Sequence, residues 1–121
     1  MKVYFIGAGP GNPELLTIKA ADIIKKSDMI IYAGSLINKE ILRYAKDDAL
    51  LHDSVKMNIK EIIDKILSCK NEDKIVARLH SGDPSIYGAI LEQMLELDKY
   101  DIDYEVVPGI SSFVASGHNY H

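Results

Sequence analysis

The sequence predicts an α/β fold of three layers, with a mainly parallel five-stranded sheet between two layers of helices. Five short apolar runs rich in β-forming residues alternate with segments of helical periodicity. The chain of 121 residues is long enough for one domain with a substantial core. Because right-handed crossovers join parallel strands, we expect ligands to bind beyond the carboxyl ends of the strands.

Each predicted strand is followed by a loop or by a helix-like segment. The strands are expected at residues 3–6, 29–32, 49–51, 74–79 and 104–107. The helical segments are expected at residues 13–25, 36–44, 59–67 and 86–100. The segment 59–67 has the clearest amphipathic pattern, because its isoleucines recur at helical spacing opposite charged side chains.

The first strand leads into a glycine-rich loop, Gly7 to Gly11, and then into a helix that Asn12 and Pro13 are expected to start. Alternate glycines leave backbone amides uncovered, which suits a nucleotide-like cofactor. The loop lacks the Gly-Lys-Ser/Thr ending of a phosphate-binding P-loop. It also lacks the third glycine and the acidic residue of a dinucleotide site. A tight turn without a ligand is the alternative.

Composition narrows the classes of function. The net charge of -4 and the lack of basic runs argue against nucleic-acid binding. Cys69 is the only cysteine, which excludes a disulfide within the chain and suits a reducing compartment. His118 and His121 have helical spacing but no third ligand nearby, so we expect no metal. With no leader pattern and no run that could span a bilayer, the chain is expected to be soluble and cytoplasmic, without a membrane partner.

Loops from four parts of the chain should meet at the carboxyl edge of the sheet, namely residues 7–11, 33–35, 79–83 and 108–112. Some of their polar residues also suit plain structural roles. Asp83 precedes Pro84 and fits an ordinary helix cap, and Ser111 and Ser112 fit the cap of a last short helix. Capping and ligand contact are compatible, so these residues stay candidates for a binding site.

Four stretches of the chain, taken in sequence order, resemble the tetrapyrrole methylases: VYFIGAGPGNPELLTIKA, YAGSLI, ARLHSGDPSIYGAILEQM and EVVPGISSF. The resemblance covers residues 2 to about 115. It is strongest to the branch that methylates carbon 11 of cobalt-precorrin-4 in cobalamin biosynthesis. It implies an S-adenosylmethionine-dependent C-methyltransferase that acts on a tetrapyrrole as a homodimer, with the cofactor folded between two α/β domains.

The resemblance also implies which residues contact the cofactor: Pro10, Ser81, Gly82, Asp83, Ile86, Ser111 and Ser112. Ser35 and Lys56 are candidates for substrate contact. Basic side chains that can meet substrate carboxylates, or equally be ordinary surface charges, are Lys39, Arg43, Lys56 and Arg78. No catalytic residue is assigned. A sulfonium methyl is already activated, so the protein mainly has to align it and exclude water.

The chain departs from the family pattern in two ways. Uroporphyrinogen methylases carry an acid after the tyrosine that ends the second strand, proposed as a base, where this chain has Ala33. Family members also have a second α/β domain, so residues 1–121 are expected to form a single N-terminal domain with the usual C-terminal domain absent. Three alternatives stay open: methylation of another tetrapyrrole such as uroporphyrinogen III, methylation of a modified histidine in a protein, and a non-catalytic binding or assembly module.

Overall fold

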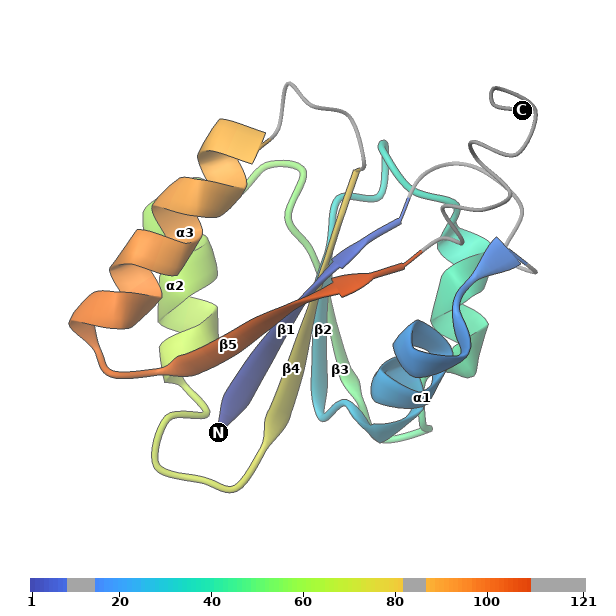
Figure 1. Ribbon diagram of the computed structural model, residues 1–121, viewed down its shortest axis with the longest axis horizontal. Coiled ribbons are helices and arrows are strands. Elements are labelled where there is room, and N and C mark those ends of the chain that lie inside the picture. The colour runs from blue at the N-terminus through green and yellow to red at the C-terminus, as the bar shows by residue number, and fades with distance from the viewer. Residues whose placement is uncertain (9–14, 82–86, 110–121) are drawn as a thin grey trace, which may run out of the picture.

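The computed structural model describes residues 1–8, 15–81 and 87–109, in which strands and helices alternate (Figure 1). The strands are β1 (Lys2–Gly7), β2 (Met29–Tyr32), β3 (Leu50–Asp53), β4 (Ile75–His80) and β5 (Asp103–Pro108). The helices are α1 (Ile18–Lys26), α2 (Ile59–Leu67) and α3 (Tyr87–Lys99), together with the 3-10 helix η2 (Lys39–Tyr44).

The five strands form one sheet in the order β3-β2-β4-β1-β5, and every neighbouring pair is parallel. The predicted five-stranded parallel sheet is therefore confirmed. β1 lies between β4 and β5, and its last residue, Gly7, pairs with His80 on one side and with Pro108 on the other. The carboxyl ends of three strands thus meet at one place.

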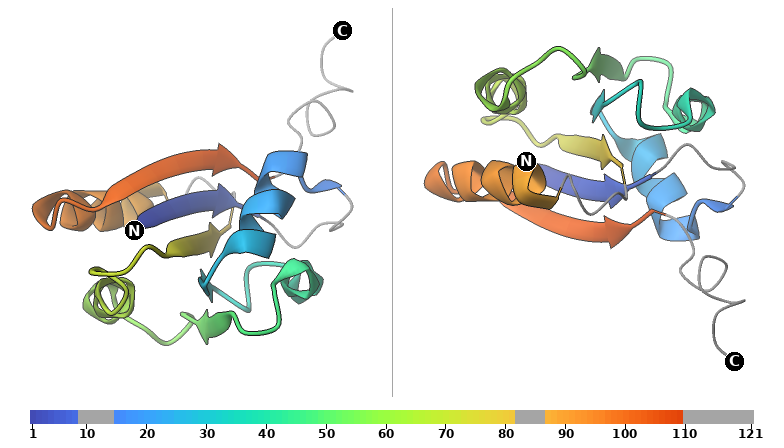
Figure 2. Two further views of the ribbon diagram at one scale, coloured as in Figure 1. Left: turned by 90° about the horizontal axis from the view of Figure 1, so that it is seen from below. Right: turned by 90° about the horizontal axis from the view of Figure 1, so that it is seen from above.

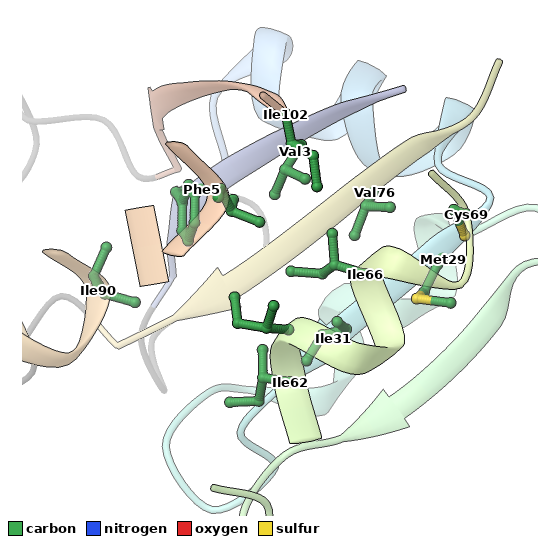
Figure 3. Packing of buried hydrophobic residues seen from close by; sticks show 12 residues of the cluster. Val3, Phe5, Met29, Ile31, Ile62, Ile66, Cys69, Val76, Ile90 and Ile102 are labelled. Carbon is green, nitrogen blue, oxygen red and sulfur yellow. The ribbon is translucent and has the colours of Figure 1, made fainter. Parts of the chain in front are cut away.

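Helices cover both faces of the sheet, as the three-layer prediction requires (Figures 1 and 2). Alternate strand residues point to opposite faces. Val3 and Phe5 of β1 join the core under α2 and α3, which Figure 3 shows, whereas Ile6 joins the core under α1 and η2. The central strands are therefore buried on both sides, which explains their largely apolar sequences, whereas the edge strands β3 and β5 are partly exposed.

Two helix starts differ from the sequence prediction. α1 begins at Ile18, because the Thr17 side chain accepts a hydrogen bond from the Ala20 N–H and caps the helix there. The predicted helix included residues 15–17, and this part of the prediction is wrong because these residues precede α1. Asn12 and Pro13, the predicted start, lie outside the described residues. In the second unit a turn after β2 occupies residues 34–36, and only Lys39–Tyr44 is helical.

The helix α2 follows the prediction closely. Asn58 and Glu61 form a capping box at its start, with each side chain bonded to the other residue's backbone N–H. Its isoleucines at positions 62, 63 and 66 are buried under the sheet.

The described ranges contain no helix that is both long and apolar enough to cross a membrane.

Candidate ligand-binding site

The loops that follow β1, β4 and β5 converge at the carboxyl edge of the sheet. The Ala8 N–H donates to the His80 carbonyl at 2.7 Å, so the chains leaving β1 and β4 stay together. Gly109 lies so close to β1 that an added Cβ would overlap the carbonyl oxygen of Gly7 and lie 2.8 Å from its carbonyl carbon. Only a glycine allows this approach, which brings the loop after β5 against the end of β1.

Thr17 ties the start of α1 to the same edge. Its hydroxyl donates to the Pro108 carbonyl at 2.7 Å, and its N–H donates to the Gly109 carbonyl at 2.9 Å. The residue that caps α1 therefore also holds the end of β5. The described residues of three of the four predicted loops, those after β1, β4 and β5, therefore lie together.

A pocket of about 600 Å³ opens beside these loops, between α3 and β5. We call it the His80 pocket. Its lining combines the strand ends with apolar side chains of the helix: Gly7, His80, Tyr87, Ile90, Leu91, Met94, Val106, Val107, Pro108 and Gly109. A largely apolar pocket of this size with few polar groups is typical of a small-molecule site.

His80 is the buried polar side chain of this pocket, with 7% of its surface exposed. Its Nδ1 lies 2.9 Å from the Ser81 carbonyl, which can only accept, so Nδ1 carries the proton. Burial lowers the pKa of His80, the bond to Ser81 opposes this in part, and the Arg78 charge lowers the pKa further. Nε2 of this neutral ring has no hydrogen-bond partner among the described residues, so it presents an unused acceptor.

A second pocket, of about 660 Å³, lies at the carboxyl ends of β2 and β3 and reaches β4 and α3. We call it the Arg78 pocket. Its polar lining residues are Ser54, Asn58, Lys60, Arg78 and Gln93. Arg78 and His80 are two residues apart on β4 and therefore project from the same face of the sheet.

Arg78 is almost fully buried, with 4% of its surface exposed. Its Nε donates to Gln93 Oε1 of α3 at 3.1 Å, and its Nη1 donates to the Leu79 carbonyl at 2.8 Å. Burial lowers the pKa of Arg78 to about 10, which leaves the guanidinium charged at neutral pH. Both partners are neutral, so the structure holds a buried cation against the Arg78 pocket.

Asp53 lies beside Ala33, the position at which uroporphyrinogen methylases were said to carry an acid. Asp53 ends β3 and pairs with Tyr32, the last residue of β2. Its Oδ1 accepts from the backbone N–H groups of Gly34 and Val55, and these bonds lower its pKa. Asp53 thus organises the two loops at the Arg78 pocket as an ionised acceptor. The strand predicted at residues 49–51 ends two positions before Asp53, so sequence reasoning did not single this residue out.

The structure places the predicted site residues as follows. Ser81 is buried, and its carbonyl receives the His80 bond. Ser35 and Lys56 are exposed beside the Arg78 pocket, while their neighbours Leu36 and Val55 line it. The other predicted cofactor contacts lie outside the described residues: Pro10, Gly82, Asp83, Ile86, Ser111 and Ser112.

Of the basic side chains named above, only Arg78 is buried, whereas Lys39 and Arg43 on η2 are exposed. Sequence reasoning also missed Gln93, which is buried in mid-helix against Arg78. A polar residue on the inward face of an amphipathic helix was the available signal. Within residues 1–8, 15–81 and 87–109, no group of three or more His, Cys, Asp and Glu side chains is arranged to hold a metal ion.

Comparison with known proteins gives consistent matches over nearly the whole chain. Residues 2–118 match the family described as Tetrapyrrole (Corrin/Porphyrin) Methylases. A cobalt-precorrin-4 C(11)-methyltransferase of Methanocaldococcus jannaschii is 55% identical over 115 residues, covering 95% of this chain and 44% of that protein.

Two solved structures have the same fold. The X-ray structure of a cobalt precorrin-4 methyltransferase, a cobalamin biosynthetic enzyme, superposes with a TM-score of 0.83 at 38% identity and covers 97% of this chain and 49% of that one. A uroporphyrin-III C-methyltransferase from Thermus thermophilus, complexed with S-adenosylhomocysteine, has a TM-score of 0.73 at 32% identity and covers 97% and 48%. This chain spans about half the length of the proteins it matches.

Proposed function

The chain belongs to the tetrapyrrole methylase family, and from that premise we propose that it serves in methyl transfer from S-adenosylmethionine to carbon 11 of cobalt-precorrin-4. The observation that carries the proposal is the pocket at the carboxyl edge, where the loops predicted to contact the cofactor leave β1, β4 and β5 beside His80. The reaction would belong to cobalamin biosynthesis, the role named for a structural neighbour.

The His80 pocket fits the adenosyl part of S-adenosylmethionine. Its largely apolar walls suit an aromatic base. Gly7, His80 and Gly109 would hold the ligand from the described residues. Ser81 and the predicted contacts at Pro10, Gly82, Asp83, Ile86, Ser111 and Ser112 would complete the site.

When bound, the cofactor supplies a methyl group on a positively charged sulfur, which needs no further activation. The chain's own residues then have two tasks. The loops at the ends of β1, β4 and β5 fix the orientation of the ligand, and the apolar side chains of α3 and β5 keep water away from it. Methyl transfer achieved by orienting the ligand and excluding water requires no covalent nucleophile on the protein.

We assign to the chain the part played by the first half of its longer relatives. The activity is therefore tested on the chain joined to the remaining half of the M. jannaschii relative, with the chain alone in parallel. Substrates are cobalt-precorrin-4, other precorrins and uroporphyrinogen III, and the readout is transfer of labelled methyl. We expect transfer to cobalt-precorrin-4 by the joined protein.

Each other result has a defined meaning. Preferential transfer to uroporphyrinogen III would favour that molecule as the substrate, which is the alternative that the Thermus thermophilus neighbour supports. No transfer to any tetrapyrrole contradicts the proposal and leaves two alternatives: methylation of a modified histidine in a protein, and a non-catalytic binding or assembly module.

We include a cytoplasmic location and self-association in the proposal. The free thiol of Cys69 is compatible with a reducing compartment. Leu95 on α3 is more than half exposed, does not line the His80 pocket and offers apolar surface to a second copy. Sedimentation at several protein concentrations accompanies the assay, and a strictly monomeric chain would refute the self-association.

A further inference from the structure

The Arg78 pocket contains a buried positive charge that no acidic side chain of the described residues balances. Among the described residues, none of the ion pairs includes Arg78, and its two hydrogen-bond acceptors, Gln93 and the Leu79 carbonyl, are neutral. A buried cation is costly unless an anion meets it. The described residues that line this pocket include a second cation, Lys60, and no carboxylate. The pocket is therefore electrostatically suited to an anion.

The guanidinium has donors left for such an anion. Arg78 uses Nε and one N–H of Nη1 for its two hydrogen bonds, which leaves N–H groups on both Nη1 and Nη2. Adjacent N–H groups of this kind match the two oxygens of a carboxylate. Gln93 and Leu79 meanwhile hold the planar group in one orientation, so little freedom is lost when a ligand binds.

We propose that Arg78 binds a carboxylate side chain of the macrocyclic substrate and that Gln93 positions it for this contact. The inference rests on the proposed function, because the acetate and propionate groups of a tetrapyrrole precursor supply the carboxylate. Arg78 and His80 project from the same face of β4, so the contact anchors the macrocycle at the edge where the cofactor pocket lies.

A residue kept only for stability would behave differently from one kept for binding. Arg78→Met removes a buried charge that lacks an anion, but it also leaves the Gln93 amide oxygen and the Leu79 carbonyl without their donor. We therefore expect this variant to stay folded with a changed unfolding temperature, and to bind a polycarboxylate macrocycle at least about tenfold more weakly, since a charge-assisted bidentate contact is lost.

A second variant keeps the arginine. Gln93→Glu preserves the shape of the side chain but places a carboxylate 3.1 Å from Arg78 Nε, so the internal pair competes with the substrate anion. We expect it to fold normally and to weaken binding as well. Lys65→Met is the matched control, because it removes one positive charge from an exposed position in the last turn of α2 that does not line the pocket. Its affinity should be close to wild type.

The experiment is a fluorescence titration of the full chain and the three variants with uroporphyrin, a stable polycarboxylate macrocycle, together with thermal unfolding. Weaker binding by both pocket variants, with folding intact and the control unaffected, supports the proposal. Wild-type affinity in Gln93→Glu, or no binding by the wild-type chain, overturns it. If methyl transfer fails but uroporphyrin binding still depends on Arg78, the anion site stands and the proposed function does not.

Discussion

At the scale of single residues, Asp28 holds together the amino ends of three strands. Its carboxylate accepts from Lys46 Nζ at 2.7 Å and from the Ile75 N–H at 2.9 Å, and its carbonyl accepts from the Leu50 N–H at 2.9 Å. These bonds join β2 to β4 and β3 at the edge opposite the pockets. The hydrogen bond from Lys46, followed by that from Ile75, lowers the pKa of Asp28.

We expect Asp28→Asn to lower the free energy of unfolding by about 1 kcal/mol at neutral pH, because a charge-assisted bond becomes a neutral one. Since the pKa is lower in the folded state, this stabilisation is present above the unfolded pKa, near 4, and declines as the pH falls through the folded value. Urea unfolding at pH 7 and pH 3 measures it. Asp22→Asn, in the exposed pair with Lys26, is the control and should change little. An Asp28→Asn effect of equal size at both pH values contradicts this assignment.

The residues of the two pockets could be predicted only in part. Sequence reasoning named Arg78 among four basic side chains that can meet substrate carboxylates or equally be surface charges, and it included His80 only within the loop at residues 79–83. What distinguishes them is three-dimensional: Arg78 meets Gln93 from a helix fifteen positions later, and His80 is left with an unused nitrogen. Hydrogen-bond partners that come from another helix or strand leave no local pattern in the sequence.

At the scale of elements, the close contact between the ends of β1 and β5 depends on Gly109. We expect Gly109→Ala to destabilise the chain by about 1–3 kcal/mol, because the new methyl group collides with the Gly7 backbone and with Ile6 Cγ2. Gly88→Ala in α3 is the matched control, since its new methyl meets open space and alanine favours helix. Thermal unfolding of both variants checks this. A Gly109→Ala chain as stable as Gly88→Ala would show that the contact does not constrain the edge.

The periodicity of apolar residues was enough to predict which segments are helices and which are strands. It was not always enough to predict the residue at which an element begins or ends. The strands and the amphipathic helix α2 were predicted close to their observed bounds. The start of α1 was placed too early, because the local signal at Asn12 and Pro13 competes with Thr17, whose hydroxyl also bonds to Pro108 of β5. Contacts of this range, 91 positions apart, are outside what a local sequence window contains.

At the scale of the whole molecule, alternation of strands and helices was enough to predict a parallel sheet covered on both faces, but not the strand order. Right-handed crossovers permit several orders, and the observed one places β1 between β4 and β5. This order is what brings Gly7, His80 and Pro108 together. The location of the candidate site at the carboxyl edge therefore follows from a general rule for parallel sheets, and its composition follows from the particular order.

The most direct test of the account is a titration of the isotope-labelled chain with S-adenosylhomocysteine, followed by the backbone and imidazole NMR signals. We predict saturable shifts concentrated at Gly7, His80 and Gly109, which line the His80 pocket. The signals of Lys2, Ile75 and Asp103, at the amino ends of the same strands, should stay in place. Shifts confined to that amino edge, or no saturable shift at all, would contradict a cofactor site at the carboxyl edge.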